Sequence, residues 1–77
     1  MNTDNELKVF AENVAYLRKK HGYSRRKMAQ LLNTSSYTIA RLESGTVPRR
    51  LGASFLLRIT DVFGIRPEAM LKPLDGQ

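Results

Sequence analysis

The sequence predicts an all-α fold, a compact domain of five helices, and two observations carry that prediction. Apolar residues recur at helical spacing through most of the 77 residues, and no stretch alternates apolar and polar side chains as a half-buried strand would. Serine, glycine and proline stand where helices typically begin and end. A chain of this length forms one domain with a modest core, which we place at residues 4–72, with 73–77 as a frayed tail.

The first predicted helix begins after Thr3 and extends to His21. Thr3 followed three residues later by Glu6 fits a capping box, in which each side chain bonds the other's backbone amide. Gly22 suits the left-handed position that ends a helix. The core-facing stripe of this helix is formed by residues at helical spacing, Leu7, Phe10, Val14, Leu17 and His21.

Two short helices joined by a tight turn are predicted next. Ser24 suits the N-cap of a helix over residues 25–32, and Ser35 suits the N-cap of a helix over 36–44. Asn33 between them tolerates the left-handed conformation that a tight turn requires. The inward positions of the earlier helix are Met28, Ala29 and Leu32.

The last third of the chain predicts two more helices. The fourth ends at Gly64, and the fifth covers residues 67–71, because Pro67 suits a first helical position and Pro73 blocks extension. The residues from 46 to 52 form a loop between the third and fourth helices. The stripe of the fourth helix is formed by Phe55, Leu56, Ile59, Val62 and Phe63.

Basic residues are concentrated in the middle of the chain. Within a net charge of +6, residues 18–50 contain nine lysines or arginines and a single acid, Glu43. The remainder of the chain has a small acidic excess. This asymmetry favours a polyanionic partner, and the alternative is a hydrated basic surface that only aids solubility.

Composition disfavours several other classes of protein. The chain has no cysteine and one histidine, His21, so it offers neither a disulfide nor a metal cluster, and we expect no metal and no cofactor. There is no apolar run long enough for a membrane span and no signal-peptide pattern, so we expect a cytoplasmic protein. Ser35 and Ser36 have no neighbouring base, and we expect no enzymatic activity.

The helix over 36–44 has two contrasting faces. Ile39 and Leu42 point inward, whereas Tyr37 and Arg41 point outward. An α-helix fits the major groove of DNA, where arginine can bond guanine with two hydrogen bonds. The predicted base contacts are Ser36, Tyr37, Ala40 and Arg41. The alternative is an ordinary amphipathic helix with a hydrated outer face.

Basic and hydroxyl side chains flank this helix. Such groups, together with backbone amides at a helix N-terminus, bind phosphates and fix the register of a protein on DNA. Arg49 and Arg50 lie in the loop over residues 46–52, and the alternative for that loop is a plain connection that does not touch DNA. The predicted phosphate contacts are Arg25, Arg26, Thr34, Thr38, Arg49 and Arg50.

Residues 24–45 resemble the helix-turn-helix of the lambda repressor and Cro superfamily, the XRE-type family. Ala29 stands where that family packs a small residue between its two helices, and Asn33 replaces its usual turn glycine. The run ARLESG resembles the family's R-I-E-N-G ending. The resemblance extends over about residues 7–72. It implies a lambda-repressor-like fold and a repressor-like transcriptional regulator that binds double-stranded DNA in a sequence-specific manner, encoded by a bacterium or phage.

The resemblance also implies roles for three charged residues. In the family, residues matching Arg18 and Glu43 form a partly buried ion pair between the first and third helices. Arg25 stands where the family usually has a glutamine that contacts phosphate and braces the recognition helix. We expect Arg25 to keep the phosphate contact.

Family members commonly bind palindromic sites as two-fold dimers, so a homodimer is a further expectation. The residues that could form the dimer interface are apolar residues outside the core stripes, and for each of them the alternative is simple local packing within the domain. A rival function within the same fold is an antitoxin or adaptor that binds a toxin or another protein, and non-specific RNA binding is disfavoured by the lack of clustered aromatic residues. The candidate dimer residues are Val47, Pro48, Leu57, Ile65 and Leu74.

Overall fold

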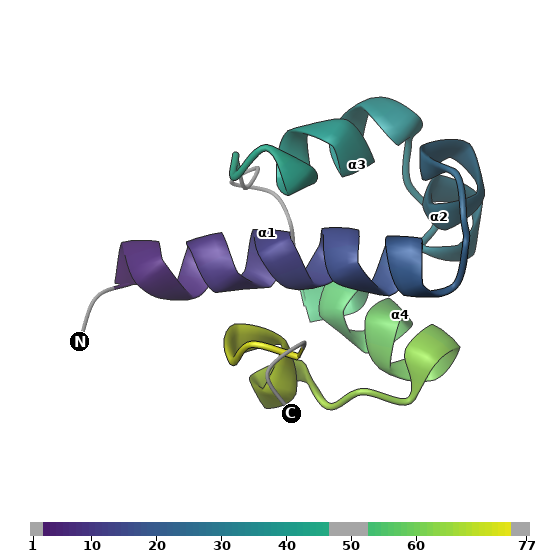
Figure 1. Cartoon of the computed structure of the whole chain (residues 1–77). Helices are drawn as coiled ribbons and strands as arrows, with labels where there is room; N and C mark the ends of the chain where they lie inside the picture. Colours follow the sequence, from purple (N-terminus) through teal and green to yellow (C-terminus); the bar gives the residue numbers. More distant parts are fainter. Residues whose placement is uncertain (1–2, 47–52, 75–77) are drawn as a thin grey trace.

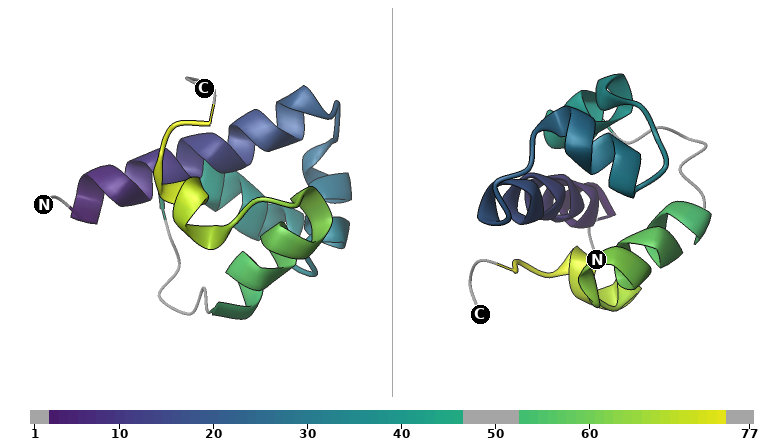
Figure 2. Two further views of the ribbon diagram at one scale, coloured as in Figure 1. Left: turned by 90° about the horizontal axis from the view of Figure 1, so that it is seen from below. Right: turned by 90° about the vertical axis from the view of Figure 1, so that its right-hand side faces the viewer.

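The computed structural model describes residues 3–46 and 53–74, which form four α-helices and one 3-10 helix. α1 (Thr3–Lys20) runs through the middle of the domain (Figure 1). α2 (Arg25–Leu31) and α3 (Ser36–Glu43) lie on one side of it, and α4 (Ala53–Phe63) and η1 (Pro67–Leu71) lie on the other, as the right view in Figure 2 also shows. The predicted all-α class and the order of the five helices are confirmed.

The helix bounds differ from the predicted ones by about one residue, which is the usual scatter at frayed ends. α1 begins at Thr3 itself, and the N-cap proposed for its side chain lies outside the described side chains. α2 and α3 each end one residue early, because Leu32 and Ser44 are their C-caps. The fifth helix is of the 3-10 type, with Pro67 in its first turn as predicted.

One apolar core joins all five helices. The buried side chains that the first four helices contribute to this core come from the inward positions predicted for them, and Met70 of η1 lies outside any predicted stripe. Leu56, Val62 and Phe63 of α4 pack against this core while only partly buried. Burying each large apolar side chain contributes roughly 1.5–3 kcal/mol. The buried set is Phe10, Val14, Leu17, Met28, Ala29, Leu32, Ile39, Leu42, Phe55, Ile59 and Met70.

Leu7 is not part of this core, contrary to the prediction. Its side chain remains 37% exposed. The first turns of α1 extend beyond the neighbouring helices (Figure 1), so no described element covers the stripe at that end. The helical period placed Leu7 on the correct face, but the length of the partners decides how far along α1 that face is buried.

The C-terminal segment is anchored more firmly than predicted. The buried amide of Asn13 donates hydrogen bonds to the carbonyls of Met70 and Lys72, at 2.7 and 2.8 Å, and accepts one from the amide of Leu74 at 3.1 Å. Leu74 also packs against the core, so it is not frayed. The rest of the predicted tail, residues 75–77, lies outside the described residues.

His21 closes the end of α1 beside α4. Its ring stacks on Tyr23 at 5.4 Å between centroids and lies 5.1 Å from the ring of Phe63, while its Nδ1 is 3.0 Å from the carbonyl oxygen of Leu17. These contacts hold the ring at the helix end, but His21 is exposed and is not part of the core, contrary to its place in the predicted stripe.

Candidate nucleic-acid interface

Two serine caps fix where α2 and α3 begin. Ser24 accepts a hydrogen bond from the amide of Lys27 at 3.0 Å, and Ser35 accepts one from the amide of Thr38 at 3.1 Å. Each cap of this kind typically contributes about 1 kcal/mol. Both predicted caps are confirmed, and they leave the exposed N-terminal turns of the two helices in a defined orientation.

The turn between α2 and α3 depends on Asn33. Its φ is +57°, the left-handed conformation predicted for this position. The amides of Asn33 and Thr34 bond back to the carbonyls of Gln30 and Ala29, at 3.3 and 2.8 Å, and so close the end of α2. Asparagine tolerates this backbone better than most residues with a Cβ. The tight turn therefore sets the angle at which α3 leaves α2.

α3 separates a buried face from an exposed one, as predicted. Ile39 and Leu42 are fully buried, whereas Tyr37 is 69% exposed and Arg41 is exposed beside it. Ser36 is exposed in the first turn. Ala40 is half-buried between the two faces, so the backbone of α3 lies close to the outer surface there.

Tyr37 and Arg41 contact each other on the exposed face. Arg41 Nη1 donates a hydrogen bond to the Tyr37 hydroxyl at 3.1 Å, and the guanidinium carbon lies 5.5 Å from the centre of the tyrosine ring. Both distances are within the ranges of a hydrogen bond and a cation–π contact. The two side chains thus form one polar and basic feature on the surface of α3.

The four described residues among the predicted phosphate contacts differ in exposure. Arg25 and Arg26 are exposed in the first turn of α2. Thr34 and Thr38 are half-buried, and the Thr38 hydroxyl lies 3.0 Å from that of the cap Ser35. The other two, Arg49 and Arg50, lie outside the described residues, as do the loop residues 47–52 as a whole.

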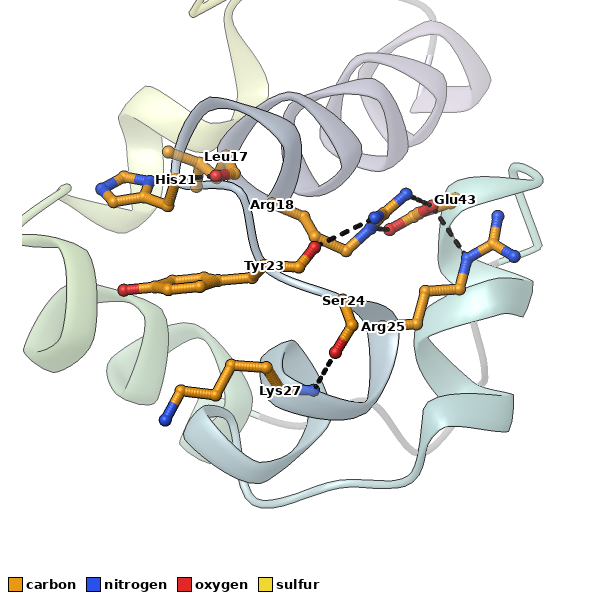
Figure 3. A network of polar contacts seen from close by, with 8 residues as sticks. All are labelled: Leu17, Arg18, His21, Tyr23, Ser24, Arg25, Lys27 and Glu43. Atoms are coloured by element: carbon orange, nitrogen blue, oxygen red, sulfur yellow. Dashed lines mark hydrogen bonds and ion pairs between the residues drawn. The ribbon is translucent and has the colours of Figure 1, made fainter.

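An ion-pair network links α1, α2 and α3 at Glu43 (Figure 3). Arg18 binds the Glu43 carboxylate with two hydrogen bonds, Nε to Oε2 at 2.5 Å and Nη2 to Oε1 at 3.0 Å. Its remaining Nη1 donates to the carbonyl of Tyr23 at 3.1 Å. The side chains of Arg18 and Glu43 are only 15% and 6% exposed, so this pair holds α3 against α1.

Burial and charge act in opposite directions on Glu43. Burial alone raises the pKa of its carboxyl, but the hydrogen bonds and positive charges of Arg18 and Arg25 outweigh that effect and hold the pKa below its ordinary value. The carboxylate is therefore ionised at neutral pH. Because an unpaired buried charge is costly, each partner of this network depends on the others.

A family model described as Helix-turn-helix, HTH_3, matches residues 14–70, which is more than half of the chain. The chain belongs to the HTH_3 family. This is the XRE/Cro/C1-type helix-turn-helix that residues 24–45 resemble, and membership implies DNA binding. Domains of this family are typically not enzymes. No curated protein and no solved structure matches the chain.

Arg25 gives this HTH_3 domain a contact that the sequence pattern did not indicate. Its Nε lies 3.2 Å from Glu43 Oε1, so α2 is tied directly to the end of α3 (Figure 3). The Arg25 side chain is 52% exposed, and a contact of this kind contributes at most about 1 kcal/mol. Arg25, which stands in place of the family's usual glutamine, braces α3 through Glu43 while part of its guanidinium stays in solvent.

The contact between Tyr37 and Arg41 was also missing from the predictions. Their spacing of four residues is the available signal, because side chains at i and i+4 on a helix are neighbours.

The candidate dimer residues differ in how far the structure buries them. Leu57 is 58% exposed, Ile65 and Leu74 pack against the core, and Val47 and Pro48 lie outside the described residues.

Two other features, a membrane-spanning helix and a cluster of metal ligands, are absent from residues 3–46 and 53–74. None of the helices there is both long and apolar enough to cross a membrane. The same part of the chain contains no group of three or more histidines or carboxylates placed to hold a metal ion.

Proposed function

We propose that this HTH_3 domain is a sequence-specific, repressor-like transcriptional regulator that reads the major groove of double-stranded DNA in the cytoplasm with α3. The observation that carries the proposal is the exposed face of α3. Tyr37 and Arg41 stand out from a helix whose opposite face is fully buried and whose start is fixed by the Ser35 cap. Such a helix, with a basic exposed face, matches the width of the groove.

Base preference would come from the exposed side chains of α3. Arg41 has the donors to bind guanine O6 and N7, which is worth about 1–3 kcal/mol of discrimination for one good bidentate contact. Ser36 lies in the first turn, where a short side chain reaches a base edge. Ala40 leaves room for close contact with a thymine methyl group.

Affinity would come mainly from the phosphate contacts. Arg25 and Arg26 lie in the first turn of α2, next to backbone amides that carry a partial positive charge. Thr34 and Thr38 would add hydroxyl contacts close to the start of α3. Arg49 and Arg50 complete the set in sequence, and each phosphate neutralised by such a residue steepens the salt dependence of binding.

The experiment that tests the proposal has two steps. Selection of binding sites from a random pool of duplex DNA should enrich one sequence family. Gel shifts on the enriched duplex and on a shuffled one, each at two salt concentrations, should then show a sequence preference that persists as salt rises. Binding to neither duplex in dilute buffer would overturn the proposal and favour an adaptor or antitoxin whose partner is another protein.

A further inference from the structure

The exposed face of α3 contains one organised feature, the contact between Tyr37 and Arg41. Long side chains on a helix surface ordinarily move among many rotamers. Here the guanidinium of Arg41 is held both by the hydroxyl of Tyr37, at 3.1 Å, and by its ring, at 5.5 Å from the centre. Both residues are exposed. The contact therefore does little for the core, and its position favours a role in recognition.

The hydrogen-bond chemistry of the pair is one-sided. An arginine has five N–H donors and no acceptor, and Arg41 uses one nitrogen, Nη1, on Tyr37. The Tyr37 hydroxyl is the acceptor in that bond, so its own proton is left to donate elsewhere. Together the two side chains present mainly donors beyond their mutual contact.

A surface of donors selects for base edges that carry acceptors. Guanine presents two acceptors in the major groove, N7 and O6, and thymine presents O4. Adenine places its N6 amino group beside its N7 acceptor and cytosine presents an amino group alone, and an amino group meets another donor unfavourably. The neighbouring base that the hydroxyl reaches is thus expected to be guanine or thymine.

From this geometry we infer that Tyr37 positions Arg41, and that the two act as one unit reading a guanine next to a second guanine or a thymine. The inference rests on the proposed function and specifies its target. Tyr37 reduces the rotamer freedom that Arg41 would otherwise lose on binding, and pre-organisation of this kind improves affinity without a new contact. Because the hydroxyl sets the direction of the guanidinium, it determines specificity as well.

The test compares five variants on the selected duplex, on all its single-base variants and on a shuffled duplex. Tyr37→Phe keeps the ring and removes the hydroxyl, Tyr37→Ala removes both, and Arg41→Ala removes the guanidinium. The double variant Tyr37→Phe/Arg41→Ala completes a cycle. Tyr16→Phe is the matched control, because it removes a hydroxyl from the half-buried Tyr16 of α1, outside α2 and α3.

We expect Tyr37→Phe to lower discrimination at the guanine by about fivefold and at the neighbouring pair as well, a modest loss typical of the net contribution of one hydrogen bond. Binding to shuffled DNA and the melting temperature should stay unchanged. In the Arg41→Ala background, removing the hydroxyl should no longer alter discrimination at the guanine. Tyr37→Ala should show a larger loss than Tyr37→Phe, and Tyr16→Phe should behave as the parent.

Two results would overturn the inference while leaving the proposed function intact. One is an enriched site at which the Tyr37→Phe and Arg41→Ala losses simply add, which would show that the side chains act separately. The other is an equal loss on selected and shuffled DNA, which would place the hydroxyl on a phosphate. A pool that enriches no sequence would overturn the proposed function itself, and the inference with it.

Discussion

Single side chains on this domain divide into those that would read bases, those that would bind phosphates and those that hold α3 in place. Arg41 is exposed, and its guanidinium contacts Tyr37. Glu43, two residues further along, is 94% covered and bonded to two arginines. Neighbouring positions on one short helix thus serve different purposes, because successive residues point about 100° apart around its axis.

Arg41→Ala and Arg49→Ala should separate base reading from phosphate binding. Loss of Arg41 should relax the preference at one base pair by about 1–3 kcal/mol and leave shuffled DNA nearly unaffected. Loss of Arg49 should weaken all duplexes alike and reduce the slope of log affinity against log salt by about one unit. Titrations at several salt concentrations measure both effects. Equal weakening of specific and shuffled DNA by Arg41→Ala would contradict the assignment of Arg41.

Glu43→Ala should destabilise the fold and alter its response to acid. The variant leaves Arg18 without its carboxylate partner in a mostly buried site, at a cost of about 3 kcal/mol. Because the pKa of Glu43 is lowered in the folded state, the stabilisation is fully present above the ordinary glutamate value of 4.5 and is lost as pH falls through the lowered pKa. The variant should lack that part of the acid-induced loss.

Urea unfolding of the parent, of Glu43→Ala and of the exposed control Glu12→Ala between neutral and acidic pH measures this effect. The base preference of folded Glu43→Ala should match that of the parent, since the Glu43 side chain is buried against Arg18 and is not among the predicted base contacts. A variant that melts normally but has lost its sequence preference would contradict this division of roles.

The helices owe their bounds to local signals, and the turn between α2 and α3 is the clearest case. Three successive features there were readable from the chain: the Ser24 cap, the left-handed Asn33 and the Ser35 cap. All three depend on hydrogen bonds within a few residues. Changes at these positions should therefore act through the backbone without disturbing the core.

Asn33→Ala should lower the free energy of unfolding by about 1 kcal/mol, because alanine is strained in the left-handed conformation. Asn33→Gly should be close to neutral, since glycine adopts a positive φ without that strain. Alanine and glycine are both small residues and position 33 is exposed, so packing does not complicate the comparison. Urea unfolding curves measure both values. A loss with glycine equal to that with alanine would show that the asparagine side chain itself stabilises the turn.

The complete domain depends on contacts between residues far apart in the chain, and Asn13 makes the longest-range ones. Its side chain bonds backbone groups 57 to 61 residues away and holds the segment after η1 against α1. A buried amide satisfied by three partners gives a more specific link than apolar packing alone would provide.

Asn13→Ala should release this segment and destabilise the domain by about 3 kcal/mol, because it leaves the carbonyl of Met70 buried without a partner. Hydrogen exchange at the amide of Leu74 should accelerate strongly, whereas amides in α2 and α3 should change only as far as global stability does. The exposed Glu12→Ala is again the control. Unchanged protection at Leu74 would contradict the anchoring role.

Two copies of the domain should bind one palindromic duplex. A single α3 contacts too few base pairs to specify a site, and two-fold dimers on half-sites about one helical turn apart are the common solution. Sedimentation with and without a palindromic duplex measures the stoichiometry. One copy per palindrome at saturation would contradict the expectation. Leu57 is the described candidate left largely uncovered, so Leu57→Ser should weaken the second binding step.

Much of this molecule follows from patterns within short windows of sequence. Helical periodicity, serine caps and turn residues predict five helices, their buried stripes and the outward face of α3, because each depends on neighbours one or two turns away. The resemblance to the XRE-type family adds the pairing of Arg18 with Glu43, which no local pattern contains.

Other features exist only because distant segments meet. The second arginine on Glu43, the three bonds of Asn13 and the exposure of Leu7 depend on how far each helix extends past its partners and at what angle they cross. Periodicity gives the direction of a side chain around its own helix but carries no information on what stands opposite. Packing supplies that information, and here it anchors the C-terminal segment and braces α3.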